Sequence, residues 1–216
     1  MSTNQNGVKE LSPSKSIDNL AKALLIHKKN SGGNVFLMTT PGKESSGTSG
    51  LALRLCQYLS TRKVKTLVIT FRQEEIAALK REFQIDSSKV LDSIDTKLDE
   101  ANLMSLIQHE HGLDVLIGGD LKQQSPAFFV ETDWRNGLAN LSASYELVII
   151  TSGPLLTEPE SSLIASSVDA VALEVSYQVT TKRMLDRALQ VLKYAKVGDI
   201  LGVYVDLPSN RHHFDF

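Results

Sequence analysis

The sequence predicts an α/β protein with a single doubly wound, mostly parallel sheet and helices on both of its faces. Two features of the 216 residues lead to this fold class. Short apolar runs recur along the chain, and stretches with helical spacing of apolar residues separate them. Each run is apolar throughout, which is typical of parallel strands buried on both faces. We expect strands at residues 34–39, 66–70, 114–117, 147–151, 170–175 and 200–205.

The helical patterns divide the chain into one domain with two tails. The first pattern begins at Ser16 and ends before Gly32. We predict a flexible N-terminal tail over 1–15, a domain over 16–207 and a C-terminal tail over 208–216. Further helices are expected at 50–62, 74–83, 99–109, 127–142, 160–166 and 181–196.

Two local patterns invite other interpretations. Adjacent residues on a helix point in different directions, so we interpret His109, Glu110 and His111 as a polar helix end rather than a metal site. Most tyrosines lie beside or within apolar patterns, and we expect these to be buried as packing residues: Tyr58, Tyr145, Tyr194 and Tyr204.

Composition excludes several classes of protein. Lys and Arg total 23 against 25 Asp and Glu, so the net charge of −2 argues against a nucleic-acid binder, although a local basic patch stays open. The single cysteine, Cys56, excludes an intramolecular disulfide and a cysteine-based zinc site. No apolar run approaches a membrane span, and the N-terminus has no signal-peptide core. These features predict a cytoplasmic protein without direct membrane insertion.

The loop after the first strand has some features of a phosphate-binding loop. Glycines and hydroxyl residues lead into the next helix, where free backbone N–H groups can bind phosphate. However, Glu44 follows Lys43, so the Lys-Ser/Thr pair of a working P-loop is missing, and the acid repels phosphate. An ordinary polar turn and a weakened anion site both remain open. The residues of the vestigial loop would be Gly42, Lys43, Ser45 and Ser46.

Several motifs occur in the order and spacing of one known family. Residues 41–42 read Pro-Gly and residues 50–52 read Gly-Leu-Ala. Residues 112–119 read Gly-Leu-Asp-Val-Leu-Ile-Gly-Gly, and residues 145–154 read Tyr-Glu-Leu-Val-Ile-Ile-Thr-Ser-Gly-Pro. The chain resembles, over about residues 12–206, the cytoplasmic tyrosine kinase domain of bacterial exopolysaccharide and capsule systems. That family lies in the deviant-Walker P-loop group, with the cell-division and partitioning ATPases.

The resemblance implies a P-loop NTPase-like fold, and the departures from the family imply lost chemistry. The family places two aspartates at the end of the second strand and one at the end of the Walker B strand. Here these positions carry Thr70, Arg72 and Thr151, none of which replaces a carboxylate as a Mg²⁺ ligand. We therefore expect no catalytic residues, no metal and no required cofactor, with residual ATP or ADP binding left open.

The resemblance also implies a partner. We expect a pseudokinase that regulates or scaffolds polymer assembly by docking on cytoplasmic segments of an inner-membrane polysaccharide co-polymerase, which determines chain length. The protein would then be cytoplasmic and peripheral to the inner membrane. A divergent ATP-binding tyrosine autokinase or ATPase is the alternative, and a partitioning-type adaptor is a third. The family's ring-forming motif is eroded to Ser16, Asn19 and Lys22, so a homo-oligomer stays open without those contacts.

Overall fold

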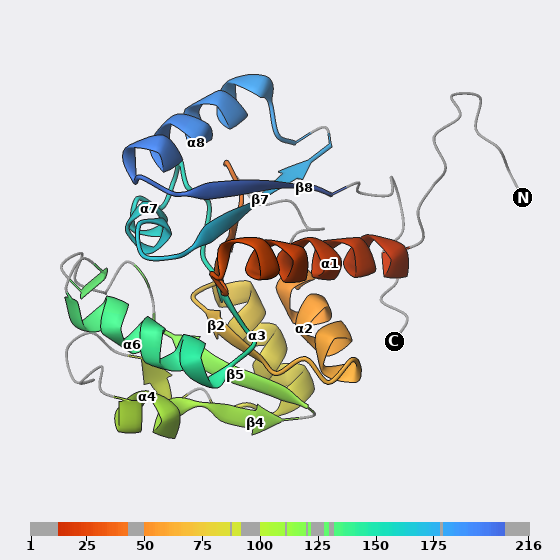
Figure 1. The fold of residues 1–216 in the computed structure, drawn as a ribbon, viewed down its shortest axis with the longest axis vertical. Helices are drawn as coiled ribbons and strands as arrows, with labels where there is room; N and C mark the ends of the chain where they lie inside the picture. Colours follow the sequence, from red (N-terminus) through yellow and green to blue (C-terminus); the bar gives the residue numbers. More distant parts are fainter. Residues whose placement is uncertain are drawn as a thin grey trace, which may run out of the picture.

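The computed structural model describes residues 13–42, 50–86, 88–91, 100–110, 112–119, 121, 128–129, 132–177 and 179–205. Their strands form one sheet in the order β3-β5-β2-β6-β1-β7-β8, with β4 paired to β5 off this path (Figure 1). All pairs are parallel except β4 with β5. The strands are β1 (Val35–Thr39), β2 (Thr66–Thr70), β3 (Val90–Leu91), β4 (Gln108–Glu110), β5 (Leu113–Gly118), β6 (Leu147–Thr151), β7 (Ala170–Ser176) and β8 (Asp199–Val205).

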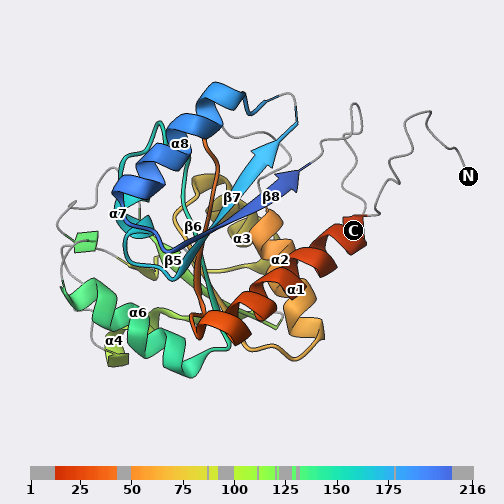
Figure 2. The same ribbon diagram turned by 45° about the horizontal axis from the view of Figure 1, so that its top comes forward.

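Helices cover both faces of the sheet, as the sequence predicts (Figure 2). One face packs against α1 (Pro13–Ser31), α2 (Leu51–Thr61) and α3 (Gln73–Phe83). The other face packs against a second group of helices and forms a separate hydrophobic cluster. These are α4 (Glu100–Leu106), α6 (Thr132–Ser144), α7 (Glu160–Ala165) and α8 (Lys182–Tyr194). The central strands β1, β2 and β6 are therefore buried on both faces.

Several elements differ from the sequence-based prediction. Helix α1 begins at Pro13, three residues before the expected start, since proline is well suited to the first turn of a helix. Helix α4 ends at Leu106, so the expectation that His109 closes this helix is wrong. His109 lies in β4 instead, with Nδ1 2.6 Å from Asp114 Oδ1 on β5. The two-residue strand β3 was also missed, because it is too short to carry a pattern.

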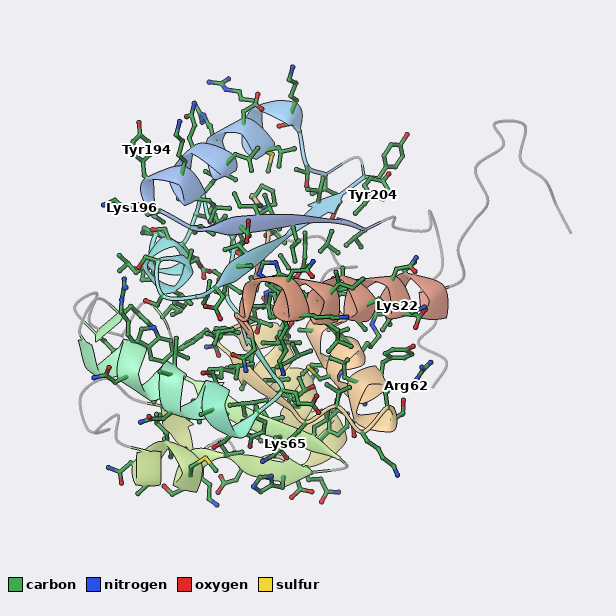
Figure 3. All side chains as sticks on the ribbon, viewed as in Figure 1. Lys22, Arg62, Lys65, Tyr194, Lys196 and Tyr204 are labelled. Atoms are coloured by element: carbon green, nitrogen blue, oxygen red, sulfur yellow. The ribbon has the colours of Figure 1, made fainter. Side chains whose placement is uncertain are left out.

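The tyrosines are less buried than the sequence predicts. Tyr145 is buried in the core, as expected. Tyr194 and Tyr204, by contrast, are 87% and 63% exposed and extend away from the ribbon (Figure 3). Tyr194 is the last residue of α8, and Tyr204 lies on β8, which borders the sheet. The prediction that these two tyrosines are buried is therefore wrong. Their neighbours in the sequence are apolar, but Tyr194 lies at the end of a helix and Tyr204 lies on an edge strand.

No helix among the described residues has the length and apolar character needed to cross a membrane.

Candidate functional site at the carboxyl edge of the sheet

The ends of three central strands meet in one row. Thr70 of β2 pairs with Thr151 of β6, and Thr151 pairs in turn with Met38 of β1. Ligands of open α/β sheets bind beyond the carboxyl ends of the strands. Residues that are widely separated in the sequence are thus brought together at the edge where the family resemblance places phosphoryl-transfer chemistry.

Arg72 follows β2 directly, and its guanidinium crosses the ends of the neighbouring strands. Nε donates a hydrogen bond of 2.8 Å to the carbonyl oxygen of Ser152, and Nη2 donates one of 3.4 Å to that of Met38. Nη2 also lies 3.2 Å from Glu174 Oε1 on β7, and Nη1 lies 3.5 Å from Glu75 Oε1 on α3. One side chain therefore ties together β6, β1, β7 and the first turn of α3.

The two threonines of the row contact the same carboxylate. The hydroxyl oxygens of Thr70 and Thr151 lie 2.9 and 2.7 Å from Glu75 Oε2, and 2.9 Å from each other. Both hydroxyls can donate to this carboxylate oxygen. Glu75 thus has hydroxyl donors at Oε2, whereas Oε1 is ion-paired with the Arg72 guanidinium without a hydrogen bond.

The charged groups of this network are shielded from water. The side chains of Arg72, Glu75 and Glu174 are at most 1% exposed. The network also affects Cys56 on α2. Burial raises the pKa of the Cys56 thiol, and the nearby Glu75 raises it further. An acid that binds Mg²⁺ or activates water needs oxygen atoms that are free to face a ligand. Here the guanidinium and the hydroxyls already contact the Glu75 carboxylate, so these groups form an internal ion-pair network.

The start of the loop after β1 is fixed to the segment that follows β6. The N–H groups of Leu155 and Leu156 donate to the carbonyl oxygens of Thr40 and Pro41, at 3.0 and 3.2 Å. The Thr39 hydroxyl donates to the carbonyl oxygen of Gly153 at 2.7 Å. Polar groups at the ends of β1 and β6 therefore bond to one another.

Only one residue of the predicted vestigial phosphate loop falls within the described part of the chain. Gly42 lies against Met184 of α8, and a Cβ at this position would meet the flexible end of that methionine. Lys43, Ser45 and Ser46 lie outside the described residues. Phosphate binding by this loop therefore stays a prediction from the sequence.

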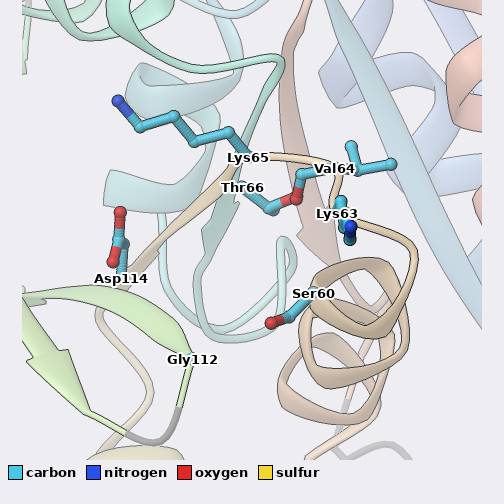
Figure 4. A pocket seen from close by; sticks show the side chains of 7 residues that line it. All are labelled: Ser60, Lys63, Val64, Lys65, Thr66, Gly112 and Asp114. Carbon is cyan, nitrogen blue, oxygen red and sulfur yellow. The ribbon is translucent and has the colours of Figure 1, made fainter.

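Metal ligands and a cavity were sought among the residues that the structure describes. In the described part of the chain, no three His, Cys, Asp or Glu side chains gather where they could hold a metal ion. A cavity of about 280 Å³ lies at the opposite edge, at the amino ends of β2 and β5 (Figure 4). Burial, together with a hydrogen bond to Asp114 beside this cavity, raises the pKa of Tyr145. The cavity is lined by Ser60, Lys63, Val64, Lys65, Thr66, Gly112 and Asp114.

Sequence reasoning missed the two acids of the network. Glu174 is the only charged residue in β7, within an otherwise apolar run, and a charge in a buried strand needs a buried partner. Glu75 stands three residues after Arg72, a spacing that brings side chains together on a helix. These two signals, taken together with an arginine directly after a buried strand, could have identified the cluster.

Comparison with known proteins identifies the fold. No family model and no curated protein matches the sequence. Among solved structures, the BceF tyrosine kinase domain matches with a TM-score of 0.66 and 20% identity, over 87% of this chain and 76% of that one. The kinase domain of the Escherichia coli tyrosine kinase ETK matches with a TM-score of 0.66 and 19% identity, over 100% and 89%. The chain has the fold of a bacterial tyrosine kinase domain.

The kinase fold belongs to a wider structural group that the chain also matches. The MinD cell-division protein of Aquifex aeolicus matches with a TM-score of 0.60 and 16% identity, over 79% of this chain and 68% of that one. The predicted P-loop NTPase-like fold with a mostly parallel sheet is therefore confirmed. Within this kinase fold, the end of β2 and the end of β6 carry the Arg72, Thr70 and Thr151 side chains described above.

Proposed function

We propose that this chain is a kinase-like subunit of an exopolysaccharide or capsule assembly system that regulates or scaffolds polymer export without transferring phosphate. The observation that carries this proposal is the buried network of Arg72, Glu75 and Glu174, with Thr70 and Thr151, across the carboxyl edge of the sheet. The tyrosine kinase fold and the motifs of the sequence support the choice of system.

The network opposes metal-assisted chemistry for a physical reason. Phosphoryl transfer depends on electrostatic stabilisation by a metal ion and by the carboxylates that hold it. Arg72 supplies a positive charge at this edge, and it is paired with the nearby acids Glu75 and Glu174. If Glu75 turned away to bind a metal, the buried guanidinium would lose a partner, and breaking a buried ion pair costs about 3–5 kcal/mol. The divergent autokinase would have to overcome this cost.

The proposal includes a partner and a location. The chain would bind cytoplasmic segments of an inner-membrane polysaccharide co-polymerase and would stay at the membrane through that partner. A fold without its chemistry still presents a rigid surface, and function can reside in that surface.

Polymer export in the source organism tests the proposal. We expect deletion of the gene to reduce or abolish export, and the wild-type chain to restore it. A double variant of the loop, Lys43→Ala with Ser46→Ala, should restore export equally well, because the surface rather than nucleotide binding is needed. Export is measured as secreted polymer, and each chain is checked for equal abundance by immunoblot.

Two outcomes would contradict the proposal in different ways. If the double variant behaves like the deletion while it remains folded and abundant, nucleotide binding matters and the divergent kinase is the better account. If the deletion leaves polymer export unchanged, the assignment to a polysaccharide system is wrong.

A further inference from the structure

Helix α8 presents a strongly basic surface to solvent. It packs on the sheet through Ala188 and Leu192, which are fully buried, and it lies at the top of the fold in Figure 1. Between residues 182 and 196, five basic side chains are exposed, and Asp186 is the only acid. The five residues that form this basic surface are Lys182, Arg183, Arg187, Lys193 and Lys196.

The stability of the helix does not account for this concentration of charge. The chain as a whole has a net charge of −2, so the positive charge of α8 stands against an acidic remainder. Lys182 and Arg183 occupy the first turn, where positive charge opposes the helix macrodipole. Among the described residues, no acid forms an ion pair with any of the five basic side chains. The basic surface is therefore available to a negatively charged partner.

Two apolar side chains accompany the charges on the exposed part of the helix. Leu189 is 38% exposed and lies one turn before Lys193. Tyr194 is 87% exposed, lies two turns after Arg187 and extends away from the ribbon (Figure 3). Basic residues mixed with leucine and an aromatic residue are typical of helices that lie on a membrane surface.

We propose that α8 docks on an anionic lipid bilayer, with its axis along the surface. The lysines and arginines contact the lipid phosphates, while Leu189 and Tyr194 lie at the level of the headgroups. These two side chains favour a bilayer over a nucleic acid or an acidic peptide, because a bilayer has an apolar layer directly beneath its charged groups. The contact goes beyond the function proposed above, since it needs neither the co-polymerase nor a polysaccharide system.

Binding of the purified full chain to lipid vesicles tests the proposal. We expect the chain to sediment with vesicles that contain about 30% phosphatidylglycerol and not with pure phosphatidylcholine vesicles, because the attraction is electrostatic. Each basic residue at an anionic surface strengthens binding by about fivefold, so adsorption by five residues is weak and reversible. Binding should disappear toward about 1 M salt, where the Debye length falls to about 3 Å.

Neutral substitutions locate the contact on α8. Arg187→Gln with Lys193→Gln and Lys196→Gln removes three charges and should weaken vesicle binding by at least about tenfold. All three residues are exposed, so the variant should keep its fold, which circular dichroism and thermal unfolding verify.

A matched variant on the other face of the sheet controls for net charge. Lys29→Gln with Arg54→Gln and Lys80→Gln removes three exposed charges from α1, α2 and α3. This variant should bind the anionic vesicles within about threefold of wild type, because its substitutions lie far from the docked helix compared with the screening length.

A fluorescent probe tests the orientation independently. Tyr194→Trp should show blue-shifted emission with anionic vesicles, whereas the native Trp134 is 1% exposed and should not respond. Four results would each overturn the proposal: no vesicle binding by the wild-type chain, equal binding to neutral vesicles, equal losses in the two triple variants, or an unchanged Tyr194→Trp spectrum on bound vesicles. Binding of duplex DNA or polyglutamate through the three α8 residues, without vesicle binding, would assign the helix to an acidic macromolecule instead.

Discussion

Replacing Arg72 by methionine is expected to lower the free energy of unfolding by about 3–5 kcal/mol. The substitution removes the positive charge and leaves Glu75 and Glu174 buried without it. It also leaves the carbonyl oxygens of Ser152 and Met38 without the guanidinium donors. Methionine keeps an unbranched stem in place of the aliphatic part of arginine, so the effect reports chiefly the loss of the guanidinium with its charge and hydrogen bonds. A loss of this size is a large fraction of the stability of a typical domain.

Chemical denaturation of the purified variants measures this effect. Arg54→Met, at an exposed arginine of α2, is the matched control and should change stability by no more than about 0.5 kcal/mol. A triple variant, Arg72→Met with Glu75→Gln and Glu174→Gln, should recover part of the loss, because no unpaired charge then remains buried. A folded Arg72→Met chain within about 1 kcal/mol of wild type would contradict the structural role given to the network.

Restoring the family's acid at the end of β6 should be the second most damaging change. Thr151→Asp places a carboxylate next to Glu75, whose Oε2 lies 2.7 Å from the present hydroxyl. Two like charges in a buried site cannot both ionise without a large penalty, and we expect a loss of at least about 3 kcal/mol at neutral pH. The same change should not create ATP hydrolysis, because Arg72 still lies across the row.

The pH dependence identifies the cause of this loss. The difference in the free energy of unfolding between Thr151→Asp and wild type should become smaller as the pH falls. At lower pH the new carboxyl group and that of Glu75 can share a proton, which removes the repulsion between them. Thr157→Asp, at an exposed threonine of the following loop, is the control and should show little change at any pH. Equal stability of Thr151→Asp and Thr157→Asp at neutral pH would contradict the buried contact between the two positions.

The long strands are predictable because each one carries its own signal. Strands such as β2 and β6 are apolar at nearly every position, and burial on both faces requires this. Strand β4 gives no such signal, because Gln108, His109 and Glu110 are polar and the strand exists only by pairing with β5. Exposure at the margin of the sheet is equally hidden, which is why Tyr204 was misjudged: its environment depends on which strand comes last.

At the candidate site, the sequence predicts positions better than contacts. The rule that parallel strands end at one edge correctly brings Thr70 and Thr151 together. The reach of Arg72 to Glu174 joins residues 102 positions apart, and no local pattern encodes that pairing. The substitutions at the positions where the resembling family has acids predict a loss of phosphoryl transfer. The structure adds that the side chains at these positions join a buried network with Glu75 and Glu174.

Phosphoryl transfer by the purified full chain is the most direct test of the central claim. The protein is incubated with Mg²⁺ and ATP labelled at the γ-phosphate, beside a Lys43→Ala control, and both released phosphate and phosphate on tyrosine are measured. Tyr177, Tyr194 and Tyr204 are exposed, so burial does not protect them from modification. We predict no release and no labelling above the Lys43→Ala control. A Mg²⁺-dependent turnover that Lys43→Ala abolishes would contradict the account.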